Sequence, residues 1–211
     1  MKIGSTRAGG IVIAVLAIAT VVAAGVEMPA ARAALYSDDA TSVTGGPLLD
    51  RDYWRASWDS MRLEDALKER QPEGAILIAV IGQIQLLDEL IKKYPNDADF
   101  KKWKARAEEI KAKIDPDADR RAEFKPGCLW NEGNYKEAYV NVNYAKTAID
   151  KQDWAAAKDG LNYAERNLGF LRQRIKNNDR VAAWPAGAAD WVTQASEEVA
   201  KETELVNSKL K

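Results

Sequence analysis

The sequence predicts an all-α protein, an antiparallel helical bundle built from two αα-hairpins, with about four core helices and flanking N- and C-terminal helices. Three observations lead to this prediction. Apolar residues beyond position 50 recur at intervals of three and four, which is the period of one helix face. Short polar breaks divide these segments. Apolar residues make up 46% of the 211-residue chain, which is enough to fill the core of one domain.

The first 33 residues have the layout of a signal peptide. Lys2 and Arg7 precede an uncharged apolar run over residues 11–26, and Ala31-Arg32-Ala33 forms a small-x-small cleavage pattern. The run is shorter than the roughly 20 residues that span a bilayer comfortably. The sequence therefore predicts an exported protein, periplasmic or secreted. Retention of residues 11–26 as an uncleaved anchor is the alternative, and membrane contact is expected only through that segment.

Residues 34–49 are predicted to be a flexible linker, because they are polar and rich in turn formers such as Gly45-Gly46-Pro47. A single helical-bundle domain is then expected over residues 50–211. Its first helix is predicted at about 50–69 and its last at about 188–210.

The four core helices are predicted to form two hairpins. In the first, apolar residues follow the three-four rhythm over 77–91 and again over 100–114, with Pro95-Asn96-Asp97 as the turn. In the second, helices are predicted over 135–149 and 154–176. Two such hairpins, docked antiparallel, make a four-helix bundle.

An internal duplication is one hypothesis for this pattern. A shift of 54 residues places the apolar positions of 100–114 on those of 154–168. Any two amphipathic helices can be aligned in this way, so the matching registers have a second, simpler interpretation.

The second hairpin begins each of its helices in a similar way. The segments are Gly133-Asn134-Tyr135-Lys136-Glu137-Ala138 and Asp153-Trp154-Ala155-Ala156-Ala157. They resemble the openings of tetratricopeptide helices, in which a turn residue and an aromatic precede an alanine that lets helices approach. Tetratricopeptide openings recur about every 34 residues, whereas these aromatics are 19 apart. A hairpin within a closed bundle is therefore favoured over a peptide-binding superhelix.

The composition excludes several mechanisms. The chain contains no His, which excludes Ser-His-Asp catalysis and imidazole-ligated zinc or haem. Its single cysteine, Cys128, cannot form a disulfide within the chain, and its apolar setting favours an inert, partly buried thiol over a reactive or cross-linking one. Basic and acidic side chains nearly balance, at 31 and 32, which argues against nucleic acid as a partner. We expect no cofactor, no catalytic residue and no enzymatic activity.

One acidic loop is a weak candidate for calcium binding. Its spacing matches positions one, three, five and nine of an EF-hand loop. The candidate ligands are Asp115, Asp117, Asp119 and Glu123. Arg120 takes the place of the required glycine, and Pro126 takes the place of the closing glutamate. Helix capping and a turn are therefore the favoured interpretation, and no metal site is assigned.

The chain is rich in tryptophan, with seven residues, and three of them lie in or beside irregular segments at about 115–134 and 177–187. These candidate binding residues are Trp130, Trp184 and Trp191. Tryptophans on loops can stack on sugars or anchor a protein partner. They can equally close the open ends of a bundle.

Together these features predict an exported, non-enzymatic binding protein, a scaffold or accessory subunit at the extracytoplasmic side of a membrane. Its expected partner is another envelope or secreted protein. The alternative is a small-ligand or glycan-binding protein that uses the loop tryptophans, which requires a concave pocket with tryptophans at its rim. A third hypothesis, a carboxylate-based hydrolase, requires two acids roughly 5 to 10 Å apart in a groove.

Overall fold

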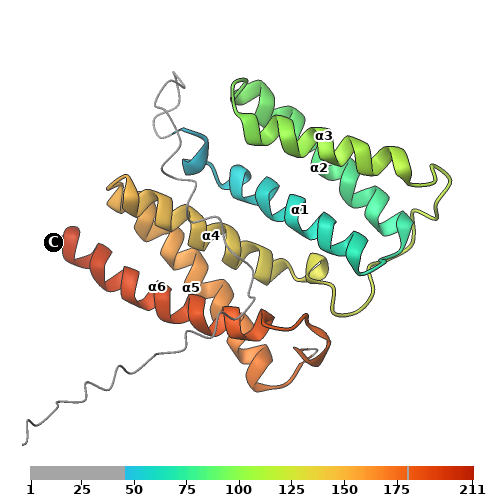
Figure 1. The fold of residues 1–211 in the computed structure, drawn as a ribbon. Coiled ribbons are helices and arrows are strands. Elements are labelled where there is room, and N and C mark those ends of the chain that lie inside the picture. Colours follow the sequence, from blue (N-terminus) through green and yellow to red (C-terminus); the bar gives the residue numbers. More distant parts are fainter. Residues whose placement is uncertain (1–45, 180) are drawn as a thin grey trace, which may run out of the picture. The chain divides into compact units, whose positions relative to one another are not determined.

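The structure is a computed structural model that describes residues 46–179 and 181–211, and every regular element in these ranges is helical (Figure 1). The predicted all-α fold is thus confirmed for this part of the chain. The predicted signal peptide, residues 1–33, and residues 34–45 of the predicted linker lie outside the described residues.

The described ranges contain six α-helices and three short 3₁₀ helices. The α-helices are α1 (Arg51–Lys68), α2 (Glu73–Lys93), α3 (Ala98–Lys113), α4 (Gly133–Asp150), α5 (Trp154–Lys176) and α6 (Ala188–Lys209). The 3₁₀ helices are η2 (Pro47–Leu49), η3 (Leu129–Asn131) and η4 (Val181–Ala183). Each segment that the sequence predicts to be helical overlaps one of the α-helices.

Aspartates fix the start of three helices. The carboxylates of Asp50, Asp97 and Asp153 each accept a hydrogen bond of 2.9 or 3.0 Å from a backbone N–H in the first turn of α1, α3 and α5. Such caps satisfy N–H groups that have no partner within the helix. The polar breaks read from the sequence therefore coincide with helix starts.

The predicted linker extends too far toward the first helix. Pro47–Leu49 forms η2, which packs on α1 and α4. The indole N–H of Trp54 donates a hydrogen bond to the Leu48 carbonyl at 3.0 Å, and Leu48 packs against the buried core of the neighbouring helices. Residues 47–49 therefore belong to the helical unit.

Helix α1 occupies a middle position that the sequence did not predict. It packs on α2 at one side and on α4 at the other, while α2 packs on α3, and α5 packs on both α4 and α6 (Figure 1). The predicted bundle, in which the two hairpins pack on each other, is not confirmed, because α1 lies between them. The physical reason is that α1 buries large side chains on two sides, including Tyr53 and Trp58.

The six helices form two three-helix units, α1–α3 and α4–α6. In each unit the first helix packs on the second, the second on the third, and the third on the first.

A tyrosine on α1 links this helix to the start of α3. The Tyr53 hydroxyl donates a hydrogen bond to Asp99 at 3.0 Å, and the Tyr53 ring lies 5.4 Å from the Trp103 ring.

The same arrangement recurs in the second unit. The Tyr135 hydroxyl donates to the Ala188 carbonyl at the start of α6, at 3.3 Å, and the Tyr135 ring stacks on Trp191 at 4.6 Å. A tyrosine–tryptophan contact thus joins the first helix to the third in each unit. The 54-residue shift is not supported as a duplication, because it aligns α3, the third helix of one unit, with α5, the second helix of the other.

Small residues bring α4 and α5 close together. A Cβ added to Gly160 would lie 2.9 Å from Tyr144 Cδ1 and 3.0 Å from Ala145 Cβ, so no larger side chain fits without movement. Ala138 and Ala157 are fully buried in the same pair of helices. These are the alanines of the tetratricopeptide-like openings, the positions at which the resemblance expects helices to approach closely.

Among the described residues, α2 is the helix whose length and composition would allow it to cross a membrane, with a mean hydropathy of 1.7 over its most apolar window. Half of that window is buried within the structure. Core helices of globular domains have the same properties, so this feature is weak evidence for a membrane span.

A carboxylate on α6 predicts a pH-dependent stability. One oxygen of Glu202, Oε2, is buried without a hydrogen-bond partner in the described structure. Burial, with a further contribution from the nearby Glu198, raises the pKa of Glu202 from 4.5 to about 7. A folded-state pKa above the unfolded value means that stability is highest below about pH 4.5 and is lost as the pH rises to about 7.

We expect Glu202→Gln to increase the free energy of unfolding by about 1 kcal/mol at pH 8, after allowance for solvent screening, and to leave it nearly unchanged at pH 4. Urea unfolding at the two pH values measures the difference. Glu204→Gln, at an exposed position of the same helix, is the matched control. Equal effects of Glu202→Gln at both pH values would contradict the prediction.

Candidate functional site

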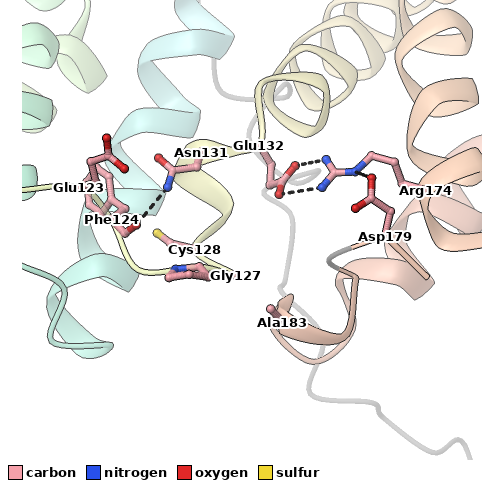
Figure 2. Close-up of a pocket in the computed structure, with 10 residues that line it drawn as sticks. Glu123, Phe124, Gly127, Cys128, Asn131, Glu132, Arg174, Asp179 and Ala183 are labelled. Atoms are coloured by element: carbon pink, nitrogen blue, oxygen red, sulfur yellow. Dashed lines mark hydrogen bonds and ion pairs between the residues drawn. The ribbon is translucent and has the colours of Figure 1, made fainter. Parts of the chain in front are cut away.

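A pocket of about 690 Å³ lies where the connection between α3 and α4 meets the connection between α5 and α6 (Figure 2). These are the two irregular segments in which the sequence placed its candidate tryptophans. The first connection supplies Glu123, Phe124, Pro126, Gly127, Cys128, Asn131 and Glu132. The end of α5 and the following residues supply Arg174, Asp179 and Ala183.

The two connections touch through their backbones at Gly127. This residue has φ of +91°, a conformation that side chains disfavour. A Cβ added to Gly127 would lie 1.8 Å from the Ala183 carbonyl oxygen. Only glycine therefore fits at this contact. The contact fixes the distance between the two walls of the pocket.

We expect Gly127→Ala to separate the two connections and to cost about 1 kcal/mol of stability, because alanine is strained at this φ and collides with backbone. Hydrogen exchange of the amides around Ala183 measures the separation and should become faster. Gly133→Ala is the control, since an added Cβ there meets nothing within 4 Å. Unchanged exchange in Gly127→Ala would show that the contact does not hold the walls together.

Hydrogen bonds from Arg174 and Trp184 to Glu132 hold one wall of the pocket together. The guanidinium of Arg174 donates to both carboxylate oxygens of Glu132, and the indole N–H of Trp184 donates to Glu132 Oε1 at 3.2 Å. Arg174 Nε also lies 3.8 Å from Asp179 Oδ2. The hydrogen bonds to Glu132 raise the pKa of Arg174. Glu132 and Arg174 thus pair with each other and serve as structural parts of the wall.

The three candidate tryptophans support the walls and do not line the pocket. Trp184 packs edge-on against Tyr135 at 5.9 Å, and Trp191 stacks on the same ring. Trp130 lies 5.5 Å from the ring of Phe124, which lines the pocket. Both irregular segments singled out by the sequence analysis supply residues of the pocket wall. Of its two interpretations, packing at the ends of helices describes the observed contacts.

Cys128 lies in the wall of the pocket and is buried, with no disulfide partner in the described residues. Burial raises the pKa of its thiol, although a hydrogen bond from the Trp130 backbone partly opposes this effect. The thiol is therefore protonated at neutral pH and is a poor nucleophile. This position agrees with the inert, partly buried thiol that its sequence context predicts.

The acidic loop makes turns and does not gather its carboxylates. Asp115 accepts a hydrogen bond from the Asp117 backbone N–H at 2.9 Å, and Asp119 accepts one from the Arg121 backbone N–H at 3.0 Å. Glu123, the fourth candidate ligand, lines the pocket. No group of three or more His, Cys, Asp or Glu side chains suited to a metal ion occurs in the described ranges.

Three acidic side chains, Glu123, Glu132 and Asp179, line the pocket. Arg174 contacts both Glu132 and Asp179, so a guanidinium takes the space that a substrate bond would need between two catalytic acids. Glu132 and Arg174 were missed by the sequence analysis. They are 42 positions apart, and no local pattern marks either residue.

Comparison of the chain with protein-family models, with curated protein sequences and with solved structures found no match.

Proposed function

We propose that the protein is an exported, non-enzymatic binding protein, an accessory subunit or scaffold at the extracytoplasmic side of a membrane. Its pocket between the two connections takes a side chain from a segment of another envelope or secreted protein. The observation that carries this proposal is the pocket itself, whose two walls come from distant parts of the chain and are fixed against each other at Gly127 and Ala183.

The composition of the walls supports binding without chemistry. Glu132 and Arg174 are paired with each other, and the Cys128 thiol is held protonated by burial. Pockets built by loops on a helical scaffold are common sites of recognition. A rigid pocket that receives one side chain of a partner is a usual anchor in protein interfaces.

A pocket-filling variant tests this proposal. Ala183 and Ala182 are both exposed on η4, but only Ala183 lines the pocket. We expect the wild-type protein and Ala182→Tyr to capture the same stoichiometric partner from native envelopes, and Ala183→Tyr to lose it. Cross-linking followed by mass spectrometry of the intact complex measures the capture. Equal capture by both variants, or no stoichiometric partner for the wild type, would overturn the proposal.

The second candidate is a small-ligand or glycan-binding protein, which the concavity of the site favours. Its volume of about 690 Å³ is within the range of small-molecule sites, about 300 to 1,000 Å³. Titration with chitotriose, followed by tryptophan fluorescence, distinguishes this candidate. A saturable shift in the wild type that disappears in Ala183→Tyr would favour it over a protein partner, since Trp184 adjoins the wall and reports on the pocket.

Export is tested separately through the mature N-terminus. Cleavage after Ala33 gives a chain that begins at Ala34, and the intact mass of protein purified from its native envelope measures this directly. A full-length mass would favour the uncleaved anchor. The binding proposal does not depend on which form is found, because all residues of the pocket come after position 120.

A further inference from the structure

The cation in the pocket wall is already paired with carboxylates. Arg174 is the one cationic side chain among the lining residues that the structure describes, and Glu132 and Asp179 face its guanidinium. The amide nitrogen of Asn131 donates to the Phe124 carbonyl at 3.3 Å. The second N–H of that amide, the remaining N–H groups of Arg174 and the weakly donating Cys128 thiol are the side-chain donors left for an incoming group.

Several hydrogen-bond acceptors of the pocket wall, in contrast, have no close donor among the described residues. Glu123 is exposed and makes no hydrogen bond or ion pair with another described residue. The side chain of Asp179 is 59% exposed, and its contact with Arg174 is long, at 3.8 Å. Asn131 keeps a carbonyl oxygen that faces no donor in the described structure. Three carboxylates thus line the pocket against one guanidinium, which gives it an excess of negative charge.

The open carboxylates lie on opposite sides of an apolar stretch. Figure 2 shows Glu123 at one side of the pocket and Asp179 at the other, with Cys128, Gly127 and Ala183 between them. A complementary group has an aliphatic stem, which covers the apolar stretch, and a positively charged head that donates several hydrogen bonds. Lysine and arginine side chains have this construction.

We propose that the pocket receives a basic side chain, lysine or arginine, presented by the protein partner. This inference rests on the proposed function and specifies the partner's chemistry. A neutral side chain leaves Glu123 and Asp179 without donors in a partly desolvated site, and an acidic one is repelled by them. The pocket therefore selects for positive charge by penalising the alternatives.

Tripeptides of matched shape test the proposal directly. The probes are Ac-Ala-Arg-Ala-NH₂, Ac-Ala-Lys-Ala-NH₂ and the citrulline analogue Ac-Ala-Cit-Ala-NH₂, which has the shape of arginine without its charge. Binding is followed by NMR through the Gly127 amide and the Trp184 indole N–H. We expect saturable shifts, with the arginine peptide bound about fivefold more tightly than the citrulline peptide, as charged hydrogen bonds at a partly exposed site provide.

Two variants test whether the Glu123 and Asp179 carboxylates bind the positively charged side chain of the peptide. Glu123→Gln and Asp179→Asn are each expected to weaken the arginine peptide about threefold and to leave the citrulline peptide unchanged. Glu204→Gln on α6 is the control and should change neither. Both altered side chains are exposed, so these substitutions do not disturb the core. Equal binding of the arginine and citrulline peptides, or no effect of either variant, would overturn the proposal.

The two proposals can fail independently. If the peptides show no preference for charge while Ala183→Tyr still loses the partner, the basic side chain is wrong and the binding function stands. If the arginine peptide binds as expected but Ala183→Tyr captures the partner normally, the pocket recognises a cation without being the partner's site, and the proposed function is wrong.

Discussion

Replacing Trp58 with alanine is expected to lower the free energy of unfolding by about 4 kcal/mol, the effect of a large cavity in a core. Trp58 is 2% exposed, and its ring lies 5.5 Å from Tyr135 and 5.2 Å from Tyr139. It extends from α1 to α4, so its loss removes contact between the two three-helix units as well as buried apolar area. Urea unfolding followed by circular dichroism measures the change.

The control is Trp154→Ala. Trp154 is partly exposed at the start of α5. Its replacement is expected to cost less than half as much, because less apolar area returns to water. If the two substitutions had equal effects, α1 would not hold the middle position that its contacts indicate.

Replacing Lys136 with methionine is expected to destabilise the protein by about 2 kcal/mol at neutral pH. Lys136 Nζ lies 2.6 Å from Asp59 Oδ1, and the Asp59 side chain is 10% exposed. The substitution leaves that carboxylate buried without its cation, and uncompensated buried charges are costly. Burial raises the pKa of Asp59, although Lys136 opposes that effect.

The pH dependence and a double variant test this explanation. With Lys136 removed, a folded-state pKa of Asp59 above its usual 3.8 makes the loss of stability largest at neutral pH and smaller as the pH falls and the carboxyl becomes neutral. Asp59→Asn combined with Lys136→Met should recover most of the stability, because neither charge remains. Urea unfolding at pH 4 and 7 measures both effects. A loss that is independent of pH would mean that packing of the lysine stem, and not charge, is responsible.

Polar contacts run along much of the junction between α1 and α4. Arg51 donates to Asn141 at 2.8 Å, and Arg55 pairs with Glu137 at 3.2 Å. Positions 51, 55 and 59 follow the four-residue period of one helix face, so the charged stripe of α1 faces α4. The contacts within the α1–α3 unit are largely apolar, through residues such as Leu63, Leu87 and Phe100. Interfaces between separate structural units are commonly more polar than their cores.

The charged stripe explains why the sequence misplaced α1. A stripe of Arg, Arg and Asp is typical of a solvent-facing surface, and the sequence analysis treated this helix as peripheral. Charged partners of the stripe are Glu137 and Lys136 on α4 and Asp159 on α5, which lie 77 to 108 positions later in the chain. No local sequence pattern predicts that pairing, because charge complementarity between distant helices depends on how the helices pack in the folded protein.

The candidate site was likewise predictable only in part, because the sequence reveals local features but not contacts between distant segments. The sequence located both connections through their irregular composition, since turn formers and the loss of helical period are local properties. It could not identify Glu123 as part of a pocket wall, or Glu132 and Arg174 as partners, because their roles depend on contacts between segments. Pro126-Gly127 was a signal of a turn, but the approach of the Ala183 carbonyl is what requires the glycine.

The sequence by itself determined that the described part of the chain is helical and where most helices begin, because apolar periodicity and aspartate caps act over a few residues. Tertiary structure alone decided the order of the helices in space, the central place of α1, the contacts of Tyr53 with Trp103 and of Tyr135 with Trp191, and the pocket. Each of these depends on which amphipathic faces meet, and several pairings of similar faces satisfy the same local pattern.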